Sequence, residues 1–240
     1  MSVGLFGPGA GSLPPLSTAR SAQGDNPGMD TVHIWGDNLR LLVEISATAA
    51  FALSGVMVAA RKRLDAVGVC AVAFLSAFGG GTVRDLLLDQ RPFFWVRHVE
   101  LLWGVLLLAL VAMLVLRQRH FELTEKAIFW PDALGLGLFT ASGMHQALLS
   151  QMPGLVAVLM GLITGVLGGV LRDMVCNEIP TVLSDHRPYA VCAFAGGWVY
   201  LGIWHTQAPG WLALLSCLAV TAGLRALAIW KRWELPAWRT

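Results

Sequence analysis

The stretch Phe78-Gly79-Gly80-Gly81-Thr82-Val83-Arg84-Asp85-Leu86 places three consecutive glycines and a charged pair inside an otherwise apolar run. Glycine destabilises a helix because it loses the most backbone entropy on ordering and leaves the backbone uncovered. Charged side chains at that depth in an apolar segment are costly too, and within a membrane they usually mark a functional site. A second stretch, Leu167-Gly168-Gly169-Val170-Leu171-Arg172-Asp173, repeats the pattern. The chain is therefore expected to be organised around two equivalent positions.

The composition is typical of a membrane protein. Of 240 residues, 56% are hydrophobic and 13% are charged, whereas an average soluble domain is roughly 25% charged. The net charge of +2 gives no reason to expect a nucleic-acid partner. The four cysteines show neither CxxC nor Cys/His spacing, so we expect no metal, no cofactor and no disulfide framework. The HExxH and GxSxG motifs are also absent, which argues against an enzyme.

Seven apolar segments each approach the ~20 residues that cross a bilayer as a helix. They predict an all-α polytopic membrane protein, with segments over 39–60, 66–88, 99–116, 128–149, 154–176, 187–205 and 210–230. Residues 1–36, rich in Gly, Pro, Ser and Ala, are expected to form a disordered extension, and Met29 is an alternative start. Asp37 and Asn38 are the expected N-caps of the first helix.

Lysine and arginine predict the orientation in the membrane. With the connection Arg61-Lys62-Arg63 in the cytoplasm, ten of the 17 basic residues lie on that side, four on the other and three within segments. The positive-inside rule then puts the N-terminus outside and the tail 231–240 in the cytoplasm, for a multi-pass membrane protein.

An internal repeat emerges when the chain is aligned with itself at an offset of 88 residues. Phe51 and Ser54 then match Phe139 and Ser142, and the same register aligns Gly80, Gly81, Arg84, Asp85 and Pro92 with Gly168, Gly169, Arg172, Asp173 and Pro180. Each copy holds three segments, so the second copy enters the membrane from the opposite side. An inverted repeat with a glycine-interrupted helix in each half indicates a transport site near the bilayer midplane. The seventh segment, 210–230, lies outside the repeat.

The glycines are the candidate hinge and solute-pathway residues: Gly79, Gly80, Gly81, Gly168 and Gly169. We expect them to kink or unwind their helices, so that a new half-helix starts beyond the first break with Thr82 as its cap. Its amides would attract a carboxylate, while freed carbonyls would attract cations. The alternative is close helix packing, as in the ridge Gly161-x-x-x-Gly165-x-x-x-Gly169.

Arg84–Asp85 and Arg172–Asp173 are the candidate charged pairs near the pathway. Two-fold symmetry predicts that Arg84 pairs with Asp173 and Arg172 with Asp85. These pairs would either lock or gate the two halves, or contact the solute directly. The other polar residues in apolar segments are Glu44, His145, Gln146 and Arg225. Glu44 is expected in a cavity or at the first interface, and the histidine either titrates near physiological pH or hydrogen-bonds between helices.

The motifs GGGTVRDLLL and GGVLRDMVCNEIP, together with FALSG and FTASG, resemble the bacterial glycine-transporter-domain family. That family carries two tandem copies of one domain, here residues 42–115 and 130–203. The second copy has Leu167 where the first has Gly79, so the two breaks differ.

The family is similar in fold to the trimeric intracellular cation (TRIC) channels. The resemblance implies a homotrimer in a bacterial plasma (inner) membrane, with a pathway in each subunit lined by the kinked second and fifth helices. The family name implies glycine or a similar small amino acid as the solute, and the channel relatives imply potassium. A scaffold that transports nothing is the remaining alternative.

Overall fold

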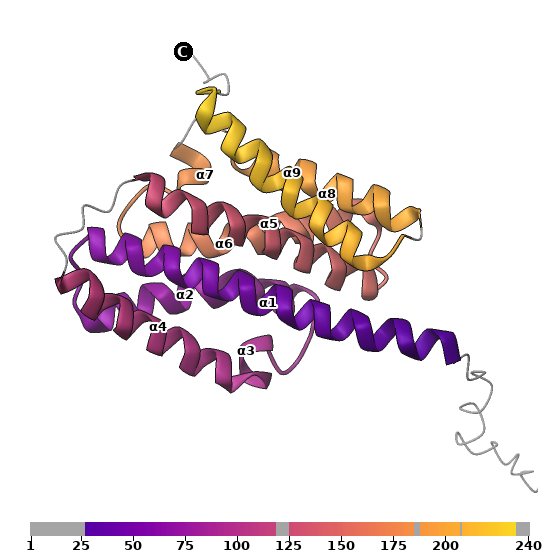
Figure 1. Ribbon diagram of the computed structural model, residues 1–240, viewed down its shortest axis with the longest axis horizontal. Coiled ribbons are helices and arrows are strands. Elements are labelled where there is room, and N and C mark those ends of the chain that lie inside the picture. The colour runs from indigo at the N-terminus through magenta and orange to yellow at the C-terminus, as the bar shows by residue number, and fades with distance from the viewer. Residues whose placement is uncertain (1–26, 119–124, 185–187, 207, 234–240) are drawn as a thin grey trace, which may run out of the picture. The chain divides into compact units, whose positions relative to one another are not determined.

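The computed structural model describes residues 27–118, 125–184, 188–206 and 208–233, which contain helices and connecting turns but no strand. Met1–Trp35 and Gly36–Thr240 form two separate compact units, and the second unit holds the candidate site. The long helices are α1 (Pro27–Arg61), α2 (Ala66–Leu87), α4 (Val99–Gln118), α5 (Glu125–Leu149), α6 (Gly154–Val175), α8 (Ala190–His205) and α9 (Gly210–Trp230). Two short helices, α3 (Phe94–Arg97) and α7 (Thr181–Ser184), follow α2 and α6 (Figure 1).

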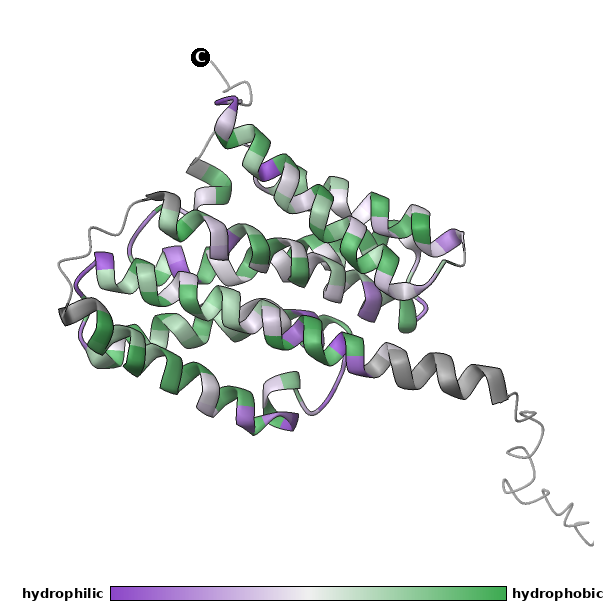
Figure 2. Ribbon diagram, viewed as in Figure 1, coloured by the Kyte–Doolittle hydropathy of each residue, from purple (hydrophilic) through white to green (hydrophobic). Residues whose placement is uncertain are grey.

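The protein is an all-helical, multi-pass membrane protein. In the described part of the chain, four helical stretches are long and apolar enough to cross a membrane: Asn38–Arg61, Ala66–Leu87, Gly154–Val175 and Gly210–Trp230. Apolar residues dominate the helices over most of their length (Figure 2), and on α4 even Trp103 and Leu107 are 69% and 63% exposed. A helix with such an apolar outer face needs lipid or another subunit against it. The predicted fold class is confirmed, whereas the count of seven crossings stays a prediction.

The first helix starts earlier than the sequence predicted. α1 begins at Pro27, so residues 27–36 are helical, and Asp37 and Asn38 lie inside the helix rather than at its cap. The rest of the expected disordered extension, residues 1–26, lies outside the described residues. The start of α2 has a side-chain cap, since Asp65 Oδ1 accepts a 2.8 Å hydrogen bond from the amide of Gly68.

The helices of the second unit pack around α6, which contacts α2, α5 and α8, while α9 lies against α5 and α8. An aromatic ring from each repeat lies between α1 and α5. Phe51 of α1 stacks on Phe139 of α5, with ring centroids 5.5 Å apart and an interplanar angle of 18°. These two phenylalanines occupy equivalent positions of the repeat, so they pack where the two halves meet.

The repeat extends to the backbone. Arg63 and Gln151, 88 residues apart, both have φ 55°, and Asp89 and Asn177, also 88 residues apart, have φ 51° and 54°. Such left-handed conformations are uncommon for residues other than glycine. Each lies in the turn that follows a helix of its repeat, so both copies use the same turns between the same helices.

α2 and α6 are helical without interruption through their glycines. The expectation of two unwound half-helices is therefore wrong. Thr82 does not cap a new helix, because its Oγ1 donates a 2.7 Å hydrogen bond to the carbonyl of Phe78 one turn earlier in the same helix. Glycine was read as a break, but within a packed bundle it serves equally well where two backbones must touch.

Candidate functional site

The site is built where α2 crosses α6, and glycine makes the crossing possible. A Cβ atom at Gly80 would overlap the carbonyl oxygen of Thr164, and one at Gly168 would lie 2.5 Å from the carbonyl oxygen of Ser76. Thr164 and Ser76 are themselves repeat equivalents, so each glycine accepts the backbone of the opposite repeat. The two helices approach so closely that no larger residue fits at either position.

Glycines away from this crossing bring other helices together. On α6, a Cβ at Gly161 would lie 2.7 Å from the carbonyl oxygen of Thr140, and one at Gly165 would lie 2.9 Å from that of Leu136. Both carbonyls belong to α5, which confirms the packing interpretation for these two positions of the ridge. Gly79 is also a packing position, because its Cβ would meet Leu171 of α6 at 2.5 Å.

The first charged cluster surrounds Arg84, which is 1% exposed. Its Nε donates to Asp85 Oδ1 at 2.9 Å, and its Nη1 donates to Glu44 Oε1 and to Ser142 Oγ, both at 2.9 Å. Ser142 Oγ in turn donates to Glu44 Oε1 at 2.9 Å. Helices α1, α2 and α5 therefore meet at one guanidinium group.

The second cluster repeats this arrangement around Arg172, which is 3% exposed. Its Nε donates to Asp173 Oδ1 at 2.8 Å, while its Nη1 donates to Asp132 Oδ1 at 2.7 Å and to Ser54 Oγ at 2.6 Å. All three partners of Arg172 are the repeat equivalents of the partners of Arg84.

The crossed ion pairs expected from two-fold symmetry are wrong. Neither Arg84–Asp173 nor Arg172–Asp85 forms, because each arginine pairs with the aspartate that follows it and with a carboxylate of its own repeat. Instead, each arginine donates a hydrogen bond to a serine of the other repeat: Arg84 to Ser142 and Arg172 to Ser54. A neutral hydroxyl bridges the halves without bringing a further buried charge that would need compensation.

The second oxygen of each motif aspartate holds the short helix that follows. Asp85 Oδ2 accepts a 2.8 Å hydrogen bond from the amide of Phe94 at the start of α3. Asp173 Oδ2 accepts one of 2.8 Å from the amide of Thr181 at the start of α7, and a second of 3.1 Å from its hydroxyl. Each Arg–Asp pair thus ties a helix crossing to the chain segment beyond the helix end.

The two clusters differ in one respect. In the second, Arg225 of α9 donates from Nη2 to Asp132 Oδ2 at 3.1 Å, and its guanidinium lies over the ring of Tyr189 at 3.8 Å. In the first, Glu44 Oε2 has no hydrogen-bond partner within the described ranges. The nearest additional cation is Arg40, whose Nε lies 3.8 Å from the other oxygen, Glu44 Oε1.

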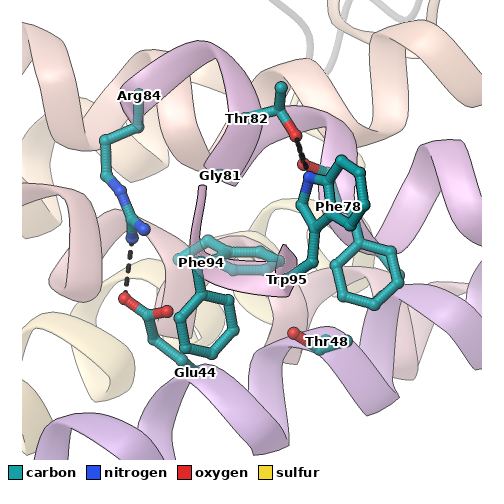
Figure 3. Close-up of a pocket in the computed structure, with 10 residues that line it drawn as sticks. Glu44, Thr48, Phe78, Gly81, Thr82, Arg84, Phe94 and Trp95 are labelled. Carbon is teal, nitrogen blue, oxygen red and sulfur yellow. Dashed lines mark hydrogen bonds and ion pairs between the residues drawn. The ribbon is translucent and has the colours of Figure 1, made fainter. Parts of the chain in front are cut away.

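A small cavity adjoins the first cluster (Figure 3). Its volume is about 10 Å³, enough for about one water-sized species. The lining residues include Glu44, Thr48, Gly81, Arg84, Phe94 and Trp95. Gly81 keeps space open here, because the nearest atom to a Cβ at that position would be Arg84 Nη2 at 4.0 Å. Its equivalent Gly169 is more crowded, with the hydroxyl of Tyr189 at 3.2 Å.

The remaining polar residues of the apolar segments make contacts at the helix ends. The Nδ1 of His145 lies 2.9 Å from the hydroxyl of Tyr200, so this histidine does hydrogen-bond between helices. Gln146 Nε2 donates to Gln90 Oε1 just beyond α2, and Gln90 Nε2 donates to Ser150 Oγ at 3.3 Å.

At the opposite end of these helices, an ion pair takes the place of the hydrogen bond between Gln90 and Ser150. Lys62 Nζ lies 2.6 Å from Glu178 Oε1, with Arg61 at 3.8 Å. Lys62 and Glu178 are the repeat equivalents of Ser150 and Gln90.

Sequence reasoning missed two parts of the site. Asp132 was not singled out, although the offset of 88 places it on Glu44 and both residues are acidic. The serines were matched as identities but given no role. Arg225 was noticed only as a polar residue, since it lies outside the repeat and no equivalent residue points to its partner. Within the described ranges, no group of three or more His, Cys, Asp or Glu residues is arranged to hold a metal ion.

Comparisons with known proteins agree on family and fold. A family model described as "Glycine transporter" matches residues 41–117 and 129–205. The UPF0126 membrane protein of Vibrio cholerae is 37% identical, over 82% of this chain and 81% of its own length. The UPF0126 inner membrane protein YadS of Escherichia coli K12 is 36% identical, over 80% of this chain and 92% of its own length.

Solved structures of cation channels share the fold. A TRIC cation channel structure superposes with a TM-score of 0.74 and 33% identity, covering 83% of this chain and 97% of the channel chain. The TRIC channel orthologue from Rhodobacter sphaeroides superposes with a TM-score of 0.75 and 29% identity, covering 80% and 98%.

Proposed function

The chain belongs to the glycine transporter family of membrane transport proteins, whose fold here is that of TRIC channels, and from this premise we propose that it conducts a monovalent cation. The observation that carries the proposal is the match to a cation channel over 97% of that channel's chain at 33% identity. The cavity of about 10 Å³ beside the first cluster supports it, because that volume suits a single ion-sized species better than an amino acid.

The pathway runs beside the crossing of α2 and α6 in this proposal. Gly79, Gly80 and Gly168 set the distance between the two helices, while Gly81 and Gly169 lie beside the two arginine clusters. The Arg84–Asp85 and Arg172–Asp173 pairs fix the helix ends. Small shifts of a crossing that leaves no room for a side chain would open or close a passage beside it. The charged pairs therefore act as locks of the closed arrangement rather than as free charges.

The proposed assembly is a homotrimer in a bacterial inner membrane. The similar structure from Rhodobacter sphaeroides is that of a trimeric channel, and the Escherichia coli relative is an inner membrane protein. The exposed apolar face of α4 is available for lipid or for a neighbouring subunit. Cross-linking and mass measurement in detergent test the trimer, and a monomer as the functional species would contradict it.

We further propose seven crossings with an outside N-terminus and inverted repeats. The end contacts support this, since Lys62 with Glu178, and Gln90 with Ser150, must each share one side of the membrane. In a variant without the native cysteines, a cysteine at Arg63 should react with an impermeant maleimide only from the cytoplasmic side. A cysteine at the equivalent position, Gln151, should react only from outside. Labelling of both from the same side would overturn the inverted arrangement.

Glycine is the second candidate solute, favoured by the description of the matching family model. Purified protein in liposomes should be measured for potassium, sodium, glycine and alanine flux. Potassium flux without glycine uptake supports the cation channel, and glycine uptake without a potassium current replaces it with the second candidate. No flux of either solute through correctly folded protein would contradict both proposals.

A further inference from the structure

The two clusters carry different buried charge. In the second, Arg172 and Arg225 face Asp132 and Asp173, so the formal charges cancel. In the first, Arg84 is the only deeply buried cation among the described residues, and it faces both Glu44 and Asp85. One negative charge of the first cluster is therefore left without a buried counterion. An uncompensated charge is expensive in a low-dielectric interior, so a cation is favoured at this place.

The position of the missing counterion follows from the repeat. Asp132 uses one oxygen for Arg172 and the other for Arg225, 3.1 Å away. Its equivalent Glu44 uses Oε1 for Arg84, and Oε2 has no partner among the described residues although Glu44 is 0% exposed. α9 supplies a tethered cation to one repeat only, because it lies outside the duplication.

A second oxygen without a described hydrogen-bond partner belongs to a residue that lines the same cavity. Thr48 is one helical turn from Glu44 on α1 and is 2% exposed, and its Oγ1 has no hydrogen-bond partner in the part of the chain that the structure describes. Glu44 and Thr48 both line the cavity shown in Figure 3. Phe94 and Trp95 cover the cavity from the segment after α2, and aromatic ring faces attract cations. Carboxylate and hydroxyl oxygens are suitable ligands for a hard monovalent cation.

The other charges around this cavity leave Oε2 available. The Arg84 guanidinium is held by Asp85, Ser142 and Glu44 Oε1. Arg40 approaches the same oxygen, Oε1, at 3.8 Å, beyond hydrogen-bond distance, and its side chain is 26% exposed. It therefore balances the cluster less effectively than Arg225 balances the other one.

We propose that Glu44 Oε2 and Thr48 Oγ1 bind one exchangeable alkali cation, in the place that the Arg225 guanidinium takes in the second repeat. The inference rests on the proposed cation conduction, because it names a binding site for that class of solute. Its test measures binding without flux, so the two proposals fail separately. The same charge pattern assigns Arg225 the role of a permanent cation that keeps the second repeat from binding a mobile one.

The test is thermal unfolding of the purified full-length protein in detergent, followed with a thiol-reactive dye, since Cys176, Cys192 and Cys217 are buried. Potassium chloride is compared with N-methylglucamine chloride at constant ionic strength. A potassium concentration ten times the dissociation constant should raise the unfolding temperature by about 3–6 °C. Glu44→Gln should abolish this potassium-specific shift, and Thr48→Val should weaken potassium binding severalfold. Glu100→Gln, which removes one exposed carboxylate from the same repeat, should retain the shift.

Arg225→Met provides an independent arm, because it removes the tethered cation of the second repeat. The stability of this variant should depend on potassium more strongly than that of the wild-type protein, and an unchanged dependence would overturn the role given to Arg225.

Equal unfolding temperatures in both salts for the wild-type protein would overturn the site itself, as would a potassium shift that survives Glu44→Gln. Stabilisation by low pH alone, equal in both salts and lost in Glu44→Gln, would mean that a proton fills the site and would also overturn it. A potassium shift without liposome flux would keep the site and reject conduction.

Discussion

Arg172 Nη1 donates a 2.6 Å hydrogen bond to Ser54 Oγ, 118 residues earlier in the chain and in the other repeat. In the equivalent bond, Arg84 Nη1 of the first repeat donates to Ser142 Oγ of the second repeat at 2.9 Å. Each repeat thus supplies a serine that binds the arginine of the other repeat, so both clusters contain residues from both repeats. The two halves are expected to unfold together for this reason, because separating them would strip a buried guanidinium of a partner.

Replacing the bridging serines tests this exchange. A buried hydrogen bond to a charged group contributes about 1.5–3 kcal/mol, so Ser54→Ala and Ser142→Ala should both lower the unfolding temperature measurably. Ser142→Ala should have the larger effect, because Ser142 contacts both Arg84 and Glu44. Ser150→Ala is the control, since that hydroxyl makes a longer, half-buried contact with a neutral amide. Effects of the two bridging serines no greater than that of the control would contradict the exchange.

The glycines of the crossing should not tolerate even a methyl group. Gly80→Ala and Gly168→Ala push Cβ against the carbonyls of Thr164 and Ser76, and such overpacking costs about 1–3 kcal/mol. We expect a lower unfolding temperature and altered flux in liposomes, and a stronger effect from Gly80→Leu. Gly104→Ala on the exposed face of α4 has open space around it and should stabilise its helix by about 0.5–1 kcal/mol. Equal behaviour of the three alanine variants would remove the close crossing from the mechanism.

Deleting either motif arginine should be severe. Arg84→Ala leaves Glu44 and Asp85 buried without their shared cation, and breaking a buried ion pair in this way costs about 3–5 kcal/mol. The yield of folded protein should fall strongly, while Arg97→Ala, whose exposed guanidinium only contacts a backbone carbonyl, should leave it unchanged. Adding Glu44→Gln to Arg84→Ala should restore part of the yield, because one of the two orphaned charges is then removed. A wild-type yield for Arg84→Ala alone would refute the locking role.

Much of this architecture could be predicted because the apolar segments and the internal repeat are both visible in a single sequence. The offset of 88 aligned Arg84 with Arg172 and Ser54 with Ser142, and each arginine does bind the serine of the other repeat. The pairing pattern could not be predicted, since symmetry allows an arginine to take a carboxylate from either copy. Asp132 could not be found by counting identities, because its repeat equivalent is a glutamate, Glu44. A comparison that also counted residues of the same charge would have aligned the two.

The glycines show why residue type alone is ambiguous. A helix break and a close helix contact both require a residue without a side chain, so Gly80 fits either interpretation until the neighbouring backbone is placed. Arg225 shows a different limit. Its partner, Asp132, lies 93 residues away on α5, and no repeat or periodicity connects the two. Contacts between a duplicated core and a helix added outside it have no signature in a single sequence.

The ionic contact between Lys62 and Glu178 should make one end of the protein sensitive to salt and leave the other end insensitive. Both side chains are about one-third exposed, so the pair contributes only about 0.2–1 kcal/mol and is screened at high ionic strength. If this contact restrains opening at its end, Glu178→Gln should raise potassium flux in liposomes up to about fivefold at low salt. The difference from the wild-type protein should vanish as salt is increased, because screening removes the pair in both. The matched change at the opposite end, Gln90→Ala, removes a neutral contact with Ser150, and its effect should not vary with salt. A salt-independent effect of Glu178→Gln would show that the residue acts through packing rather than charge.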